Sequence, residues 1–380
     1  MNIGLCGTEE VYFATFFHQQ DGGIMVTASH NPKGHNGMKL VGPEARPISA
    51  DTGLLDIKAL VEANNFPAPE NQGTVTDRLS KADYIAHLLS YVDATKLKPL
   101  KIVANPGNGG AGIAMKEIES KLPFDIIYLN ETPDGDFPNG VPNPLLLENQ
   151  AATAEAVKTH GADVGIAWDG DFDRCFFFDD DGRFIEGYYL VGLLAETILA
   201  KNPGANIIHD PRLTWNTIEQ AEQAGGHAIQ SKCGHAFIKE VMREKDAAYG
   251  GEMSAHHYFK EFSYCDSGMI PWLLIAELMS ATGKTMKALV DERMSAYPCS
   301  GEINFRVADA QAVISRILSN YEPKADLIDK SDGISMNFGD WRFNLRASNT
   351  EPLLRLNIET RGDQALLSSA TAELTQLIEA

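Results

Sequence analysis

The sequence has few cysteines and no pairing pattern among them. Five cysteines are scattered over 380 residues, and no two form a Cys-x-x-Cys pair. This spacing excludes a structural zinc site and a disulfide framework. We therefore expect reduced thiols in a cytoplasmic protein. The five residues are Cys6, Cys175, Cys233, Cys265 and Cys299.

Long hydrophobic runs are also missing. The start of the sequence, MNIGLCGTEE, has neither the basic region nor the apolar core of a secretory signal peptide. The longest apolar run, IPWLLIAELM, is interrupted by Glu277 and is too short to cross a bilayer. We expect no association with a membrane.

Basic residues are scarce. Lysine and arginine number 32, aspartate and glutamate number 52, and the formal net charge is -20. Such a field repels a phosphate backbone, which argues against a protein that binds nucleic acid. A small anionic substrate is still compatible with this charge wherever a few cations converge.

The sequence does contain regular alternation of short apolar runs and amphipathic stretches. Buried strands are expected at 22–29, 100–105, 163–170 and 205–210, and helices at 111–122, 186–200, 215–226 and 234–245. This order predicts consecutive α/β domains with mixed, mainly parallel sheets. After residue 300 the pattern changes to strands at 300–307, 333–348 and 353–362, with a helix from about Asp363. That pattern predicts a smaller C-terminal α+β domain. The expected domains are 1–75, 76–183, 184–297 and 298–380.

The strongest local signal is DGDFDR, from Asp169 to Arg174, between the apolar runs VGIAW and CFFF. Three carboxylates two residues apart repel one another unless a cation lies among them, and hard oxygen ligands suit Mg²⁺ or Ca²⁺. An EF-hand is excluded, because Arg174 and Asp180 stand where its glycine and its bidentate glutamate belong. The alternative is a solvated acidic loop, which the apolar flanks disfavour. The later DDDG at 179–182 is expected to be a hairpin turn.

A glycine-rich segment, NPGNGGAG, follows an expected strand and precedes an expected helix. Gly107, Gly109 and Gly112 match the dinucleotide-binding fingerprint. The match is weak, because any strand–turn–helix unit needs glycine for a tight turn and close packing. A nicotinamide-dependent oxidoreductase is therefore only an alternative.

Three further segments carry polar residues at strand ends. TASHNP, with Ser29 and His30, is explained either by a strand-to-loop corner or by a reactive site. In GEMSAHHYF, an extended segment would place Glu252, Ser254 and His256 on one face, where they suit sugar hydroxyls; a surface strand is the alternative. RASNTEP offers an arginine fork, hydroxyls and loop amides, which suit a phosphate, although a hairpin turn would also explain it.

Taken together, these four segments resemble the α-D-phosphohexomutase family of phosphomannomutases and phosphoglucomutases. They occur in the family's order, TASHNP, DGDFDR, GEMSAHHYF and RASNTEP, and the resemblance covers nearly the whole chain. It is strongest to bacterial phosphomannomutases of mannose activation and GDP-mannose biosynthesis. The resemblance implies small hexose phosphates as substrates.

The resemblance also implies roles for individual residues. Ser29 would carry a phosphoryl group. Mg²⁺ would be held by Asp169, Asp171, Asp173 and a phosphate oxygen on Ser29. The other implied catalytic residues are His30, Lys39, Arg174 and His235; Cys233 replaces the usual threonine two residues before His235. The implied substrate-binding residues are Arg212, Glu252, Ser254, His256, Arg346, Ser348, Asn349 and Thr350.

The implied reaction interconverts mannose 6-phosphate and mannose 1-phosphate through hexose 1,6-bisphosphate. Glucose phosphates are alternative substrates, and a non-catalytic sugar-phosphate-binding protein is an alternative from another class. A serine hydrolase using Ser29 and His30 is disfavoured, because Gly-x-Ser-x-Gly is missing and adjacent residues rarely orient as nucleophile and base.

The resemblance raises one expectation about the start of the chain. The family carries a strand and helix region with a Tyr/Asp-Ile-Arg-Gly-like segment upstream of the serine motif, whereas 28 residues precede Ser29 here. We expect an incomplete first domain, an exposed apolar face, reduced solubility and little mutase activity.

Overall fold

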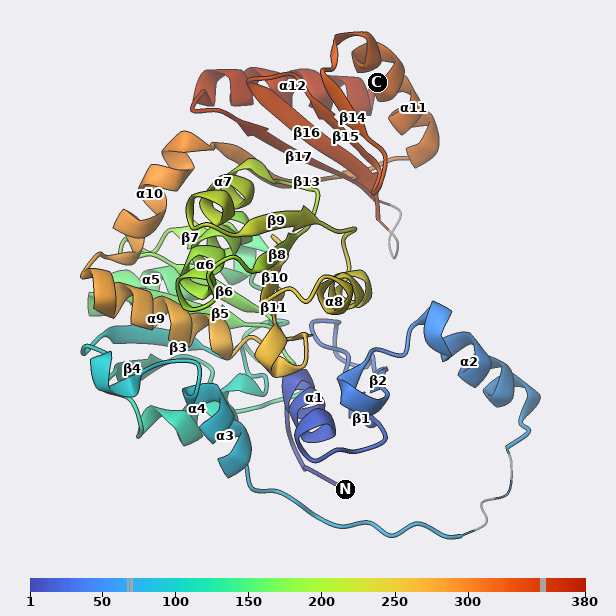
Figure 1. The fold of residues 1–380 in the computed structure, drawn as a ribbon, viewed down its shortest axis with the longest axis vertical. Coiled ribbons are helices and arrows are strands. Elements are labelled where there is room, and N and C mark those ends of the chain that lie inside the picture. Colours follow the sequence, from blue (N-terminus) through green and yellow to red (C-terminus); the bar gives the residue numbers. More distant parts are fainter. Residues whose placement is uncertain (67, 69–70, 349–352) are drawn as a thin grey trace. The chain divides into compact units, whose positions relative to one another are not determined.

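The computed structural model describes residues 1–66, 68, 71–348 and 353–380, and these form two compact units. The first unit contains Met1–Phe184 and His256–Met286, and the second contains Ile185–Ala255 and Lys287–Ala380. Within each unit, strands alternate with helices as the sequence predicts (Figure 1). No helix in this part of the chain has the length and apolar character that a bilayer crossing needs.

The first unit is built on a sheet in which β3 lies between β4 and β5. All three run parallel, and β6 joins β5 antiparallel. Its elements are α1 (Thr8–Phe17), β1 (Gly23–Val26), β2 (Met38–Val41), α2 (Leu54–Ala63), α3 (Ala82–Leu89), β3 (Lys101–Asn105), α4 (Ala111–Glu119), β4 (Asp125–Tyr128), α5 (Ala151–His160), β5 (Val164–Trp168), β6 (Cys175–Phe178), β11 (His257–Phe259), β12 (Cys265–Asp266) and α9 (Ile270–Thr282).

The described part of the second unit contains strands of two sheets. Strand β8 pairs parallel with β9 and with β10, and the C-terminal sheet has the antiparallel order β13-β17-β16-β15-β14. Its elements are α6 (Gly187–Lys201), β8 (Asn206–His209), α7 (Trp215–Gln223), β9 (His227–Gln230), α8 (His235–Glu244), β10 (Tyr249–Gly251), β13 (Cys299–Arg306), α11 (Ala310–Tyr321), β14 (Leu327–Asp329), β15 (Ile334–Asn337), β16 (Trp341–Ala347), β17 (Leu353–Thr360) and α12 (Gln364–Glu379). β7 (Phe184–Ile185) and α10 (Met286–Ala296) span the boundaries between the units. The predicted fold class, with its smaller α+β domain, is confirmed.

The first strand differs from its prediction as a buried strand. β1 pairs antiparallel with β2 in a two-stranded ribbon. Side chains alternate across a strand, so Met25 faces inward while Ile24 and Val26 are each 60% exposed. The prediction was wrong because an apolar run does not reveal whether both faces of a strand are covered. The predicted hairpin turn at 179–182 is confirmed. The Asp179 carbonyl accepts a hydrogen bond from the Gly182 amide, and the Asp179 amide donates to the Arg183 carbonyl.

Helix α1 is anchored by a buried carboxylate. Glu9 is fully buried and accepts hydrogen bonds from the Tyr84 hydroxyl of α3, at 2.6 Å, and from the Ser267 hydroxyl, at 2.8 Å. It also accepts from the backbone amides of Gly268 and Met269, just before α9. One side chain thus ties together three segments of the first unit and positions the first turn of α1.

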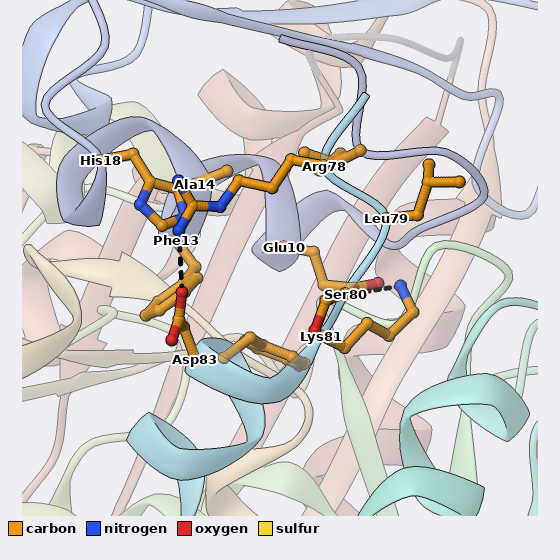
Figure 2. Close-up of a pocket in the computed structure, with 11 residues that line it drawn as sticks. Glu10, Phe13, Ala14, His18, Arg78, Leu79, Ser80, Lys81 and Asp83 are labelled. Carbon is orange, nitrogen blue, oxygen red and sulfur yellow. Dashed lines mark hydrogen bonds and ion pairs between the residues drawn. The ribbon is translucent and has the colours of Figure 1, made fainter. Parts of the chain in front are cut away.

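The same helix contacts residues 78–83 through the side chain of Glu10. Figure 2 shows Lys81 reaching Glu10 and Arg78 reaching Asp83, among the residues that line a partly open cavity of about 30 Å³. That volume holds one or two water molecules, which is too little for a sugar phosphate. The cavity belongs to the packing of α1.

Candidate active site

Ser29 lies in the turn that follows β1, in a conformation that few serines adopt. Its φ is 50°, and its amide donates to the Thr27 hydroxyl at 2.8 Å. The side chain Oγ is 2.7 Å from Asp169 Oδ2 and 2.9 Å from His30 Nδ1. The turn therefore aims the hydroxyl at a carboxylate 140 residues away along the chain.

The acidic loop connects β5 to β6 and is buried. Asp169, Asp171 and Asp173 are at most 3% exposed, and one carboxylate oxygen from each lies within 4.8 Å of the others. The solvated-loop alternative is therefore wrong. Gly170 is required for the approach of the two loops, because a Cβ there would lie 2.3 Å from the Ser29 carbonyl oxygen.

Two cations compensate the three carboxylates. The Lys39 ammonium of β2 is 2.8 Å from Asp171 Oδ2 and 2.5 Å from Asp173 Oδ2. The Arg174 guanidinium is buried and donates through Nε and Nη2 to Asp169 Oδ2, at 3.0 and 2.9 Å. The structure thus brings together seven residues predicted from the sequence, namely Ser29, His30, Lys39, Asp169, Asp171, Asp173 and Arg174.

Burial and neighbouring charge shift the protonation of this cluster. Burial raises the pKa of Asp173 to about 7, with the negative charges of Asp171 and Asp169 adding to the rise. The pKa of Asp171 is lowered, because the Lys39 ammonium outweighs the effect of burial. Burial, assisted by Arg174, lowers the pKa of His30 to about 4, so its imidazole is neutral near pH 7. Arg174 accordingly donates to His30 Nδ1.

Sequence reasoning missed several residues that support this cluster. The hydroxyls of Thr8 and Thr27 donate to Asp171 Oδ2, at 2.7 and 3.1 Å. Thr27 belongs to the TASHNP segment and could have been noticed there, whereas Thr8 carries no local signal. Asp266 was also missed: its buried Oδ2 is 2.9 Å from Nδ1 of the predicted residue His256, and this Nδ1 is 4.0 Å from Asp173 Oδ1.

The carboxylate cluster has the properties of a divalent-cation site. Its ligands are oxygens, which suit Mg²⁺. Asp171 Oδ1 is buried without a hydrogen-bond partner among the described residues, so one ligand oxygen remains uncommitted. The Lys39 ammonium already lies between two of the carboxylates, which indicates that a positive charge is favoured there. The three aspartates therefore fit a metal ion.

In the second unit, the buried side chain of Arg212 contacts two predicted sugar-binding residues. Arg212 donates to Asp210 Oδ2 at 2.7 Å and to the Ser254 hydroxyl at 3.3 Å, and its guanidinium is 3.6 Å from Glu252 Oε1. The predicted extended segment at 252–256 is wrong. Residues 253 and 254 form a turn, and Ala255 has a φ of 70°, which breaks the alternation that would place Glu252, Ser254 and His256 on one face.

The last predicted segment connects two strands, as expected. Arg346 is in β16, is 7% exposed, and lies 3.6 Å from Glu302 Oε2 of β13. Ser348 donates its amide to the Leu353 carbonyl. Asn349 and Thr350 lie outside the described residues.

His235, the predicted proton-transfer residue, begins α8 and is exposed. The amide of Gly234, whose φ is 116°, donates to Glu252 Oε1 at 2.9 Å. The start of α8 is therefore tied to the Arg212 cluster. Cys233 lies beside the same cluster, within reach of Asp210 and Glu252.

Comparison with known proteins identifies the family. Models of the phosphoglucomutase/phosphomannomutase family match four successive regions: alpha/beta/alpha domains I, II and III at 1–68, 82–182 and 186–297, and the C-terminal domain at 302–376. The chain belongs to the phosphoglucomutase/phosphomannomutase family. It is therefore an isomerase that transfers phosphate intramolecularly.

Individual relatives agree with this assignment. The chain is 62% identical to "Phosphohexose mutases" of Xanthomonas campestris pv. campestris (strain B100) and 56% identical to "Phosphomannomutase" of Escherichia coli (strain K12). Each match covers 100% of this chain and 84% of the relative. A phosphoglucomutase/phosphomannomutase family protein from Burkholderia thailandensis has a TM-score of 0.86 and 27% identity, over 99% of this chain and 82% of that protein.

The glycine-rich loop has a structural explanation in this phosphohexomutase. A Cβ on Gly109 would lie 2.6 Å from the Gly170 carbonyl oxygen, and one on Gly112 would lie 2.0 Å from that of Glu131. The Gly110 amide donates to the same Gly170 carbonyl at 3.0 Å. These glycines pack the loop against the acidic segment, so the alternative of a nicotinamide-binding site is not needed.

Proposed function

We propose that the protein is a phosphomannomutase that interconverts mannose 6-phosphate and mannose 1-phosphate, with Ser29 as the phosphoryl carrier. The observation that carries this proposal is the position of Ser29 Oγ, 2.7 Å from Asp169 Oδ2 at the edge of the carboxylate cluster. Phosphoserine has a charge near −2, so a phosphorylated Ser29 needs cations beside the three aspartates.

The first transfer moves the phosphoryl group from Ser29 Oγ to a hydroxyl of the sugar phosphate. The bond from phosphorus to Oγ breaks, a bond from phosphorus to the sugar oxygen forms, and the product is hexose 1,6-bisphosphate. The sugar hydroxyl loses its proton to a base. In the second transfer the other phosphate returns to Ser29 Oγ, and the base gives its proton back to the sugar oxygen.

The residues around Ser29 serve the transferring group. Arg174 and Lys39 balance its negative charge, and neutral His30 can contact its oxygens. Asp169, Asp171 and Asp173 would hold Mg²⁺, which would supply Lewis-acid stabilisation of the phosphoryl charge.

Two histidines are candidates for the base. His235 is the one that the family resemblance favours. His256 is supported by its own geometry: the Asp266 carboxylate accepts from Nδ1, which leaves Nε2 as the acceptor of the neutral ring.

The second unit would bind the sugar and the phosphate that is not being transferred. Glu252 and Ser254 offer an acceptor and a hydroxyl to the sugar, beside Arg212. Arg346, Ser348, Asn349 and Thr350 would bind the remaining phosphate, with the arginine providing charge-assisted hydrogen bonds.

The test is the chemistry at Ser29. Purified protein incubated with hexose 1,6-bisphosphate should gain one phosphate, located on Ser29 by peptide mass spectrometry. Ser29→Ala should lose turnover by several orders of magnitude with an unchanged melting temperature, whereas Ser319→Ala, on an exposed face of α11, should retain both. Full activity without any phosphoserine would refute the carrier role. Turnover of mannose 1-phosphate against glucose 1-phosphate would decide the preferred sugar.

A further inference from the structure

A glutamate of the second unit lies among three arginines. Glu302 Oε2 is 3.4 Å from Arg212 Nη1 and 3.6 Å from Arg346 Nη2, and its Oε1 is 3.5 Å from Arg355 Nη1. The arginines come from the loop after β8, from β16 and from β17. Arg212 is predicted to lie near the sugar and Arg346 to bind the phosphate, so the carboxylate occupies a position that suits a phosphate.

The local backbone aims Glu302 at this position. The register between β13 and β17 shifts between Cys299 and Glu302, which is the mark of a bulge, and Gly301 has a φ of 65°. Bulges beside active sites commonly redirect one side chain of a strand. Gly301 provides the positive φ without strain. The bulge therefore turns Glu302 toward the arginines.

The arginines are not fully satisfied by this arrangement. Arg212 and Arg346 are 4% and 7% exposed, and the Nε atom of each is buried without a hydrogen-bond partner among the described residues. The carboxylate contacts at 3.4–3.6 Å are longer than those of a well-formed charge-assisted hydrogen bond. A larger anion with more oxygens would satisfy these donors better.

Glu302 is also the carboxylate in this cluster that can leave. Asp210 is held by Arg212 Nη2 at 2.7 Å and by the amides of Arg212 and Met253, and Glu252 accepts from the Gly234 amide. Glu302 is 22% exposed, against 3% and 5% for these two. The carboxylates of Asp210, Glu252 and Glu302 balance the charge of the three arginines. An incoming phosphate dianion must therefore displace one carboxylate, and that of Glu302 is the least constrained.

We propose that Glu302 is a built-in competitor for the phosphate: its carboxylate occupies the arginine site in the free protein and moves out when a substrate's phosphate binds. This inference rests on the proposed function, in which Arg346 and Arg212 contact the substrate. Glu302 thereby lowers the affinity for each phosphate and keeps the site open to exchange. Such exchange suits a reaction in which the sugar must present its two phosphates in turn.

The test compares Glu302→Gln with the wild-type protein. Glutamine keeps the size and loses the charge, so inorganic phosphate measured by calorimetry should bind roughly tenfold more tightly, as expected when partly exposed ion pairs need not be broken. KM for the sugar phosphate should fall by a similar factor while kcat does not rise, because product leaves more slowly. Glu302→Asp should restore wild-type behaviour at least in part. Glu322→Gln, an exposed carboxylate of the same unit, controls for net charge.

The outcomes separate this inference from the proposed function. Weaker phosphate binding and a lower melting temperature in Glu302→Gln would show that Glu302 only supports the arginines, and would overturn the competitor role. Unchanged phosphate binding in Glu302→Gln, with weaker binding in Arg346→Ala, would also overturn it while leaving the phosphate site intact. Unchanged binding in both variants would overturn the phosphate site itself.

Discussion

Replacing Asp173 by asparagine should stabilise the metal-free protein above neutral pH, even though it removes a proposed metal ligand. Asp173 is 2% exposed and belongs to the cluster with Asp169 and Asp171. Burial, and then the charges of these neighbours, raise its pKa from 3.8 to about 7 against the opposing effect of Lys39. Without a metal ion, ionisation of Asp173 is therefore unfavourable in the folded protein.

The sign and size of the effect follow from this shift. A pKa that is higher in the folded than in the unfolded protein means that the folded state holds the proton more tightly. The resulting stabilisation is complete below pH 3.8, falls as the pH rises, and is lost above about pH 7. A span of about 3 pKa units corresponds to about 4 kcal/mol. Asparagine has no titrating proton, so the stability of the variant does not fall with pH for this reason.

The assay is urea unfolding with EDTA at several pH values from 5 to 8. The stability of Asp173→Asn relative to wild type should rise by about 3 kcal/mol across this range, most of it below pH 7, because the rest of the effect lies below pH 5. Asp51→Asn, an exposed carboxylate, should show no such trend. Added Mg²⁺ should stabilise the wild-type protein and leave Asp173→Asn unaffected. A relative stability that does not change with pH would refute the reasoning.

Two further predictions concern the packing that holds the site. Gly170→Ala should lower turnover by at least about a hundredfold, because its Cβ would collide with the Ser29 carbonyl oxygen and shift the serine. Gly135→Ala is the control and should be neutral, because a Cβ at Gly135 would meet no atom within 4 Å. Equal activity in the two variants would contradict this prediction. Glu9→Ala should lower the unfolding free energy by about 3 kcal/mol, because four buried hydrogen-bond donors lose their acceptor. Glu117→Ala, at an exposed position, is the control. A similar melting temperature for both variants would count against Glu9 as the anchor of α1.

The expectation of an incomplete first domain stays a prediction. The structure does place apolar side chains on the surface of this region: Ile24, Val26 and Met38 of the β1–β2 ribbon are 60–67% exposed. Helix α2 contains no buried residue. Solubility and activity of the chain, measured directly, will decide the expectation.

The sequence by itself determined the fold class and the composition of the carboxylate cluster. Strand–helix alternation reports which faces of each segment are buried, and this is a local property. The spacing of Asp169, Asp171 and Asp173 after a buried strand predicted a carboxylate cluster, because like charges so close in sequence need a compensating cation. RASNTEP likewise revealed its strand–loop–strand context locally.

Only the tertiary structure decided which distant residues meet. Ser29 and Asp169 are 140 residues apart, and Lys39 is 132 residues from Asp171, so no local pattern encodes their contacts. The backbone also overrode a periodicity argument at Ala255, where one positive φ reversed the direction of the side chains that follow. Glu302 carries no sequence signal at all, since a glutamate on a C-terminal strand is unremarkable until a bulge turns it toward three arginines. The local periodicity of a sequence indicates which faces are buried. Which charged groups come close enough to compensate one another depends on how the whole unit packs.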